Sequence, residues 1–513
     1  MKPTLEQSDI RDHAPGMRPG DILKIIAFAG AGKTTTLKLL AEAMPSRGVY
    51  LAFNKAIADE AKRKLALTRC TAATMHSISF GCVREIIGSP ATVNARFIRE
   101  AGILDRFNIP KVEGWNDFRI ASAVSRALSA FCNSADEDFK IQHGEDALIE
   151  SVGDPEFIRN PEKAEKARDT LRRLSGPVTE MAQALWSHMM DRSEMSHDMY
   201  LKAIDLDADL RRDAFRGYSY LMVDEAQDLN PVQRSILVKT GLPLIAVGDP
   251  YQQIYSWRGA ENALGLLEGE TKYLTQSFRF GENIAEVARH ILSLRPDGGP
   301  RQRLVGAGRG DISGHKGSKV AIVCRTNMGM IDEALRTMNR GVSLHVDNMA
   351  GLLQDVRSAQ ALFEGRIRDV SSTSLKSFDN WAELKIEAEE SDQSLARIVN
   401  LVEGNMVPEI ERLAAYQTSA ASGAAQVMIC TAHRSKGLEW PGVQLGADWK
   451  DVHDMQRRYK GAEKKSAKHK TMALEEYNAL YVAATRPILR LTGEERILFP
   501  DPEPDEEIDF ERT

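Results

Sequence analysis

The sequence predicts an α/β fold that is interrupted twice by mainly helical segments. The first observation is a series of short apolar runs that end in polar or glycine-rich clusters, because ligand sites of open α/β sheets lie at the carboxyl ends of strands. The second is a change of composition over residues 83–216 and 347–423, where helix formers dominate and no such cluster occurs. The chain has 513 residues, and since a domain averages about 150 residues we expect several domains.

A phosphate-binding loop is predicted over residues 24–39, KIIAFAGAGKTTTLKL. An apolar strand precedes the turn and the first helical residues, which are Ala29, Gly30, Ala31, Gly32, Lys33, Thr34 and Thr35. Small residues let backbone N–H groups close around phosphate oxygens, Lys33 reaches the outer phosphates, and the Thr34 hydroxyl suits Mg²⁺. The pattern G-x-x-x-x-G-K-[ST] is met except that Ala27 replaces the first glycine. The alternative is an ordinary glycine-rich turn.

A pair of acids ends the apolar run 218–223, where Asp224 and Glu225 begin the segment DEAQD. In a nucleoside triphosphatase, Asp224 would hold Mg²⁺ and Glu225 would accept a proton from the attacking water. A further apolar run ending in Asp249 supports this assignment. The alternative is a solvated acidic turn.

The segment LIAVGDPYQQIYSWRGA, residues 244–260, carries two glutamines and three aromatic residues after its apolar run. Gln252 can sense the γ-phosphate, while Tyr255 and Trp257 offer π-faces on which unpaired bases can stack. One short segment of the chain would then contact both the nucleotide and the nucleic-acid strand. The alternative is that both aromatic residues belong to the core.

Polar clusters also follow apolar runs in the second half of the chain. Arg279 lies between two aromatic residues in TQSFRF, and Arg486 closes a helix at a point where an arginine finger can act across a cleft. In TAHRSKGLEW, Thr431 and His433 suit contacts to a nucleic-acid backbone, and Glu439 can accept a hydrogen bond from a ribose hydroxyl.

Three further segments carry no specific signal by themselves and can be interpreted only together with the other motifs. Thr74 and His76 lie in TAATMHSISF at a predicted strand end or loop, where His76 by itself would be a packed surface histidine. Gln7 precedes the first strand, and an amide can pair with an adenine edge. Residues 457–470 hold seven lysines and arginines against one glutamate, and we predict a flexible basic loop, usually just solvated but placed to touch phosphates.

The bulk composition excludes several classes of protein. The five cysteines are scattered without a C-x-x-C pair, which argues against a zinc site, an iron–sulfur cluster or a disulfide framework. Residues 1–18 are too polar for a signal peptide, and there is no apolar run of membrane-spanning length, so we expect a cytoplasmic protein without membrane contact. The net charge of −6 resides in residues 501–513, an acidic tail with seven acids and one arginine, so a basic groove elsewhere stays compatible with it.

These motifs together resemble those of superfamily 1 DNA helicases of the UvrD/Rep/PcrA type. GAGKT, TMHS, VDEAQD, GDPYQQIYSWRGA, QSFR, TAHRSKGLEW and LYVAATR stand in family order along nearly the whole chain. VCRTN, TQSFRFG and KGLEW are most similar to the F-box DNA helicase branch, although no F-box precedes the motor motifs in this sequence. Two departures are Ala27 in place of Gly and Tyr251 where the family often has Asp.

The resemblance implies two RecA-like P-loop NTPase domains with parallel sheets and a nucleotide cleft between them. The implied parts are domain 1A (1–85 and 205–270), insertion 1B (86–204), domain 2A (271–340 and 425–500), a short insertion 2B (341–424) and the acidic tail (501–513). The small size of insertion 2B leaves translocation credible and processive unwinding in doubt.

The same resemblance assigns roles to residues. ATP with Mg²⁺ would be bound by the phosphate loop, with Gln7 contacting adenine and Glu439 the ribose. The catalytic residues would be Lys33, Asp224, Glu225, Gln252, Arg279 and Arg486. Contacts to single-stranded DNA would come from Asn54, Thr74, His76, Tyr255, Trp257, Arg258, Arg325, Thr431 and His433.

The function that follows is an ATP-dependent single-stranded DNA translocase and 3′–5′ helicase that acts on single strands and junctions in repair, recombination or replication. It would be found with the nucleoid, or in the nucleus of a eukaryote. The alternative is a DNA-stimulated ATPase that strips proteins from DNA, or serves as the motor of a complex with a nuclease or another repair or replication factor, without unwinding alone.

Overall fold

The computed structural model describes residues 2–493, apart from 88–99, 110, 112–114, 116, 156–157, 159, 192–194, 256–261, 310–319, 373, 377, 379, 391–392, 418–423 and 464–466. The predicted acidic tail therefore lies outside the described residues. In the described part, none of the helices combines the length and apolar character needed to cross a bilayer.

The first half of the chain forms a six-stranded parallel sheet with the order β3-β2-β4-β5-β1-β6. Its strands are β1 (Ile22–Ala27), β2 (Gly48–Ala52), β3 (Cys70–Thr74), β4 (Tyr220–Val223), β5 (Leu244–Gly248) and β6 (Glu270–Leu274). The helices next to it are α1 (Leu5–His13), α2 (Lys33–Ala43), α3 (Lys55–Lys64), α4 (Met75–Ile87), α11 (Pro231–Lys239) and α12 (Ala263–Leu266).

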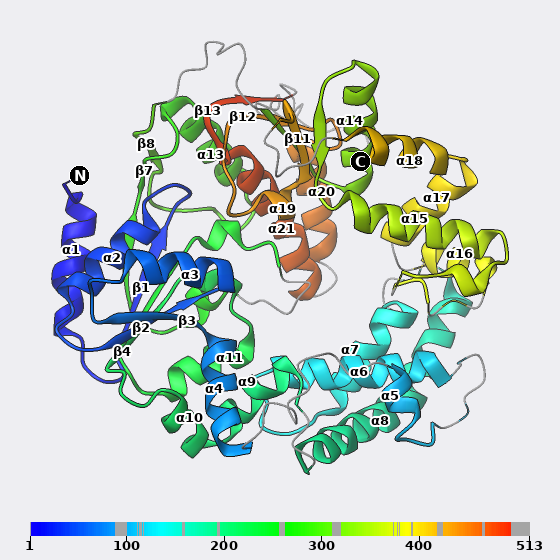
Figure 1. Ribbon diagram of the computed structural model, residues 1–513, viewed down its shortest axis with the longest axis horizontal. Coiled ribbons are helices and arrows are strands. Elements are labelled where there is room, and N and C mark those ends of the chain that lie inside the picture. Colours follow the sequence, from blue (N-terminus) through cyan, green and yellow to red (C-terminus); the bar gives the residue numbers. More distant parts are fainter. Residues whose placement is uncertain are drawn as a thin grey trace, which may run out of the picture.

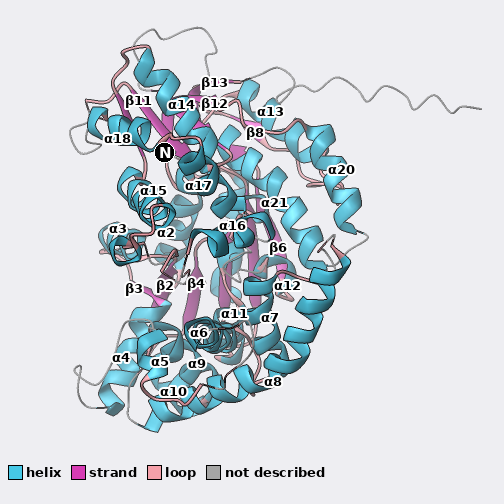
Figure 2. Ribbon diagram, turned by 90° about the vertical axis from the view of Figure 1, so that its right-hand side faces the viewer, coloured by secondary structure: helices cyan, strands magenta, loops and turns pink. Residues whose placement is uncertain are grey.

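Both faces of this sheet are covered by helices, as Figure 2 shows. Alternate residues of β2 divide between the two cores: Tyr50 and Ala52 pack with α1, α2 and α3, while Val49 and Leu51 pack with α4, α11 and the later helix α9 (His197–Leu206). A strand buried on both faces is expected where helices cover both sides of a parallel sheet.

A helical insertion follows β3 and has a core of its own. Its helices are α5 (Glu100–Leu104), α6 (Asp117–Asn133), α7 (Ile141–Val152), α8 (Pro161–Asp191), α9 (His197–Leu206) and α10 (Ala208–Ala214). Figure 1 shows α5 to α8 as a separate group below the second sheet, while α9 and α10 return to the first. The fully buried Lys202 of α9 donates to Ser134 O and lies 4.5 Å above the Phe131 ring, which ties this helix to the loop after α6.

The second half forms a five-stranded parallel sheet with the order β10-β11-β9-β12-β13. The strands are β9 (Val320–Cys324), β10 (Leu344–Val346), β11 (Val427–Thr431), β12 (Trp440–Leu445) and β13 (Pro487–Thr492), and a small pair, β7 (Gln276–Ser277) with β8 (Val305–Gly306), lies between the two sheets in sequence. The helices are α13 (Glu282–Ser293), α14 (Asn327–Asn339), α15 (Met349–Phe363), α16 (Trp381–Glu390), α17 (Gln393–Glu403), α18 (Val407–Tyr416), α19 (Ala432–Ser435), α20 (Val452–Glu463) and α21 (Ala467–Ala484). The α/β fold with two parallel sheets is thus confirmed.

Three predicted features differ from the structure. The boundary at 270/271 falls inside β6, which pairs with β1 in the first sheet. Residues 341–424 contain β10, which pairs with β11, and helices α15 to α18, which share one core with α14 and the second sheet. The described residues of the basic stretch, 457–463 and 467–470, are helical, and the buried Met455 and Tyr459 anchor α20.

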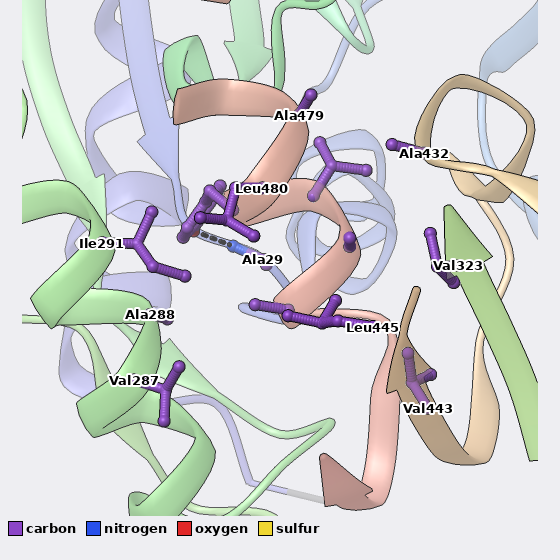
Figure 3. Packing of buried hydrophobic residues seen from close by; sticks show 14 of the residues in the cluster. Ala29, Val287, Ala288, Ile291, Val323, Ala432, Val443, Leu445, Ala479 and Leu480 are labelled. Carbon is purple, nitrogen blue, oxygen red and sulfur yellow. Dashed lines mark hydrogen bonds between the residues drawn. The ribbon is translucent and has the colours of Figure 1, made fainter. Parts of the chain in front are cut away.

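Helix α21 lies between the two sheets in Figure 1 and joins them through its buried face. Figure 3 shows Leu480 packed in one cluster with Ala29 of the phosphate loop and with Val443 and Leu445 of β12. The hydroxyl of Tyr481 accepts a hydrogen bond from Ala29 N at 3.2 Å and donates to Asp249 Oδ2 at 3.2 Å. One side chain therefore connects α21 to two loops of the first sheet.

We expect Tyr481→Phe to destabilise the protein by about 1–3 kcal/mol, because it removes the partner of a buried N–H and of a buried carboxylate. Thermal unfolding of the full chain measures the effect as a lower midpoint. Tyr477→Phe is the matched control: its hydroxyl lies on the same helix and is buried, but has no hydrogen-bond partner among the described residues. Equal midpoints for the two variants would contradict the bridging role of Tyr481.

Candidate functional site: a nucleotide cleft beside a strand-binding edge

The phosphate loop joins β1 to α2 and contains two glycines in the left-handed conformation. Gly30 has φ +73° and Gly32 has φ +79°, which glycine adopts without strain. A Cβ at Gly30 would lie 2.5 Å from Ser277 Oγ, so this position also needs glycine because β7 approaches it closely. The loop can thus present backbone N–H groups to phosphate oxygens, with Thr34 and Thr35 in the first turn of α2.

Lys33 and Glu225 form an ion pair at the edge of the sheet. Lys33 Nζ lies 2.8 Å from Glu225 Oε2, and Gln227 Nε2 donates to the same oxygen at 2.6 Å. Burial alone would raise the pKa of Glu225, but Lys33, Lys436 and the hydrogen bonds outweigh it and lower the pKa. Glu225 also has φ +52°, a backbone conformation that is uncommon for a non-glycine residue and typical of functional sites.

Asp224 is buried beside this pair. Burial and the charge of Glu225 raise the pKa of Asp224, and Tyr50 Oη donates to Asp224 Oδ2 at 2.5 Å. A cation at this carboxylate would compensate the cost of its burial, and Mg²⁺ prefers oxygen ligands. Asp224 and the Thr34 hydroxyl therefore fit the role of Mg²⁺ holders in this cleft.

The second sheet contributes Arg486 from the end of α21. Its guanidinium is 2% exposed and donates to Gln252 Oε1 at 2.9 Å and to Val482 O at 3.0 Å. Burial and the neighbouring Arg279 lower the pKa of Arg486 to about 9. Arg279 in turn donates to Glu439 Oε2 at 2.9 Å and to Thr485 O at 2.9 Å. Predicted catalytic residues of both halves are therefore joined where the two sheets meet, through the Arg486–Gln252 hydrogen bond.

Gln7 lies on the other side of the phosphate loop. Its Nε2 donates to Thr36 Oγ1 at 3.1 Å, and its Oε1 accepts from Thr4 N at 3.1 Å. A Cβ at Gly32 would lie 3.3 Å from Gln7 Nε2 and 3.7 Å from the Phe278 ring, which is 37% exposed. Phe278 was not predicted as a site residue, although it stands next to Arg279 in TQSFRF. The exposed Phe278 ring gives the region around Gly32 an aromatic face on which a base can stack.

A small pocket connects the acidic pair with the predicted strand-binding residues of the first sheet. Its lining includes Asp224, Glu225, Thr74 and His76. Thr74 ends β3, while His76 lies in the first turn of α4, where burial lowers its pKa and its ring meets that of His197 edge-on.

Tyr255 forms the second part of this edge. Its ring stacks on Phe53 with centroids 6.2 Å apart, and its hydroxyl donates to His433 O at 3.2 Å. Phe53, which is 46% exposed, was not predicted as a site residue, because an aromatic residue at the end of a strand is usually core. Asn54 accepts from Ile57 N and caps α3.

Of the remaining residues predicted to bind the DNA strand, the structure describes some and not others. Thr431 ends β11 and is buried, and His433 follows it in α19, where burial and Arg325 lower the pKa of His433 to about 4. Arg325 follows β9, but its guanidinium is held by Glu476 through Nε at 2.7 Å and Nη2 at 2.5 Å. Trp257 and Arg258 lie outside the described residues.

Comparison with known proteins gives the family. The family described as UvrD/REP helicase N-terminal domain matches residues 13–271, and the UvrD-like helicase C-terminal domain matches residues 169–492. F-box DNA helicase 1 of Gallus gallus is 31% identical over 95% of this chain and 48% of its own length. F-box DNA helicase protein 1 of Schizosaccharomyces pombe is 28% identical over 93% of this chain and 56% of its length, and DNA helicase IV of Escherichia coli is 23% identical over 53% and 45%.

The chain spans about half the length of the curated relatives it matches first. Together the two family matches nevertheless cover the chain from the phosphate loop, in the first match, to Arg486, in the second. The chain belongs to the UvrD-like DNA helicase family.

Proposed function

We propose that the chain is an ATP-dependent single-stranded DNA translocase and 3′–5′ DNA helicase that uses Mg²⁺. The observation that carries the proposal is the hydrogen bond from Arg486 of the second sheet to Gln252 of the first, beside the Lys33–Glu225 pair. A cleft that needs residues from both halves responds to nucleotide binding by changing the distance between them. Such a change is what a stepping motor requires.

Nucleotide binding would rearrange the Lys33–Glu225 pair. The loop N–H groups and Lys33 bind the phosphates, so Lys33 exchanges Glu225 for a phosphate oxygen. Glu225 then becomes free to accept a proton from the attacking water. Bound Mg²⁺ would supply charge neutralisation on the phosphates, while Arg279 and Arg486 stabilise the charge that develops on them. Gln7 and Phe278 suit the base.

Two contacts between the halves would link this chemistry to the strand. Lys436, which follows α19 between β11 and β12 of the second sheet, donates to Asp228 Oδ2 at 2.5 Å and to Gln252 O at 2.6 Å, and lies 5.0 Å above the Tyr255 ring. Gln252 and Tyr255 belong to the same short segment. Movement of the second half therefore changes the surroundings of both nucleotide and strand-binding residues.

The preferred DNA would be a single strand or a junction between a single strand and a duplex, in repair, recombination or replication. In the cell, the protein would act in the cytoplasm at the nucleoid, or in the nucleus if the host is a eukaryote. A second candidate is a DNA-stimulated motor that strips proteins, or works with a nuclease or another repair or replication factor. It is favoured by helices α15 to α18, which pack into the core of the second sheet rather than forming a core of their own.

Strand displacement by the purified chain tests the proposal and its polarity. A duplex with a 3′ single-stranded tail should be unwound in the presence of ATP and Mg²⁺, and one with a 5′ tail should not. Hydrolysis stimulated by single-stranded DNA without displacement of either duplex would favour the second candidate. Displacement from the 5′ tail alone would refute the polarity.

We expect Glu225→Gln to slow DNA-stimulated ATP hydrolysis by about 10²–10⁴-fold, the range lost with a general base. Binding of a fluorescent ATP analogue should persist in this variant and be lost in Lys33→Ala. Glu42→Gln on α2 is a control, since this exposed carboxylate forms a surface ion pair with Lys38. Hydrolysis retained in Lys33→Ala would contradict the phosphate-loop assignment.

Phe53→Ala should weaken binding of single-stranded DNA by about 1–3 kcal/mol if a base stacks at this edge. Trp257→Ala should have a similar effect. Fluorescence anisotropy of a labelled oligonucleotide without nucleotide measures both. Leu67→Ala is the control, because Leu67 is a fully exposed apolar residue after α3. Unchanged affinity in Phe53→Ala would return this residue to a packing role.

A further inference from the structure

The N-terminal helix α1 is fastened to the segment through which the chain passes from the first half to the second. We call residues 275–279 the joining segment, because they follow β6 of the first sheet and precede Phe280, which is buried in a core shared with the second sheet. The Glu6 carboxylate accepts two hydrogen bonds from Thr275, one from N at 2.9 Å and one from Oγ1 at 2.7 Å. One side chain of α1 therefore holds the first residue of the joining segment.

The joining segment also contacts the phosphate loop. Phe278 N donates to Gly30 O at 2.9 Å, so the backbone of the segment is hydrogen-bonded to the loop. The Phe278 ring lies beside Gly32, where an added Cβ would be 3.7 Å from it. The place of this ring next to the loop thus depends on a segment that Glu6 holds at Thr275.

The residue after Glu6 has its side-chain amide held in one orientation. Gln7 Oε1 accepts from Thr4 N at 3.1 Å, and Gln7 Nε2 donates to Thr36 Oγ1 at 3.1 Å. The Thr36 hydroxyl in turn donates to Gly32 O at 3.1 Å. Among the residues that the structure describes, these contacts use one donor and one acceptor position of an amide that has two of each.

An amide with one donor and one acceptor to offer matches the N7 and N6 edge of adenine. Guanine has acceptors at both N7 and O6, so the amide oxygen would face a second acceptor. This discrimination requires a fixed separation between the amide and the ring on which the base stacks. Glu6 is suited to fix it, because it precedes Gln7 on α1 and binds the segment that carries Phe278.

We propose that Glu6 is a positioning residue for the selection of adenine nucleotides. By holding α1 against Thr275, it keeps the Gln7 amide and the Phe278 ring at the separation that the base requires. This inference rests on the proposed function and deepens it by naming a residue that sets nucleotide selectivity from outside the site. Loss of Glu6 should therefore change the affinity for the nucleotide and leave the hydrolytic step unchanged.

Steady-state hydrolysis of ATP and of GTP by the full chain, with saturating single-stranded DNA, tests the inference. The wild-type chain should prefer ATP. Glu6→Ala should raise the KM for ATP at unchanged kcat, and lower the ratio of kcat/KM for ATP to that for GTP by about 5–10-fold, part of the discrimination that a bidentate contact to adenine provides. Thr275→Val removes one of the two contacts and should give a smaller loss, whereas Thr275→Ser keeps both and should retain the wild-type ratio.

Asp12→Ala is the matched control, since it removes the same charge from α1 at a residue that pairs with Arg11 on the same helix. An unchanged ratio in Glu6→Ala, or a lower kcat at unchanged KM, would overturn the inference. An equal loss in Asp12→Ala would also overturn it, because the charge of the helix would then be responsible. Equal use of ATP and GTP by the wild-type chain would overturn the inference and leave the DNA-stimulated motor in place. Absence of DNA-stimulated hydrolysis by the wild-type chain would instead refute the proposed function.

Discussion

The buried guanidinium of Arg486 constrains how the two sheets of this protein meet. A buried charge is costly unless hydrogen-bonded, and the Arg486 guanidinium donates to Val482 O of the preceding helix α21, to Leu438 O and to Gln252 Oε1. One of these partners belongs to the first sheet. The proposed nucleotide site therefore has a definite geometry only when the two halves are close, and α21 is the element that holds them there. Helix α21 also carries Tyr481 and Glu476, so one helix contacts both the phosphate loop and the Arg325 side chain that follows β9.

The functional side chains are paired with one another in this structure. The pairs are Lys33 with Glu225, Arg486 with Gln252, Lys436 with Asp228, and Arg325 with Glu476. Each pair offsets the cost of partial burial, and each can exchange its partner for a phosphate or a water. Burial raises the pKa of Asp228 to about 6 even though Lys436 lowers it, so burial and the attraction of Lys436 act in opposite directions on this carboxylate. A motor needs such exchangeable contacts, because permanent ones would lock the cleft.

The two departures from the family pattern have structural explanations. Ala27 is the fully buried last residue of β1, paired with Leu274 of β6, and a methyl group fits there. Tyr251 stacks on Phe28 with centroids 6.1 Å apart, and Arg295 lies 5.2 Å from the centre of its ring. An aspartate at this position would lose these contacts. Tyr251 thus fills the space between the strand before the phosphate loop and α13.

The sequence by itself determined the two groups of strands, the phosphate loop and the acidic pair, because local chemistry requires those residue types in that order. Strand ends are local features, so Lys33, Asp224 and Gln252 could be placed at a sheet edge without coordinates. Only the tertiary structure decided which groups meet: Arg486 meets Gln252, Phe53 meets Tyr255, and both Gln7 and Phe278 lie next to Gly32. It also assigned β6 and β10 to their sheets and Arg325 to Glu476. These contacts join residues far apart in the chain, and hydrophobic period or composition carries no information on which distant surfaces pack together.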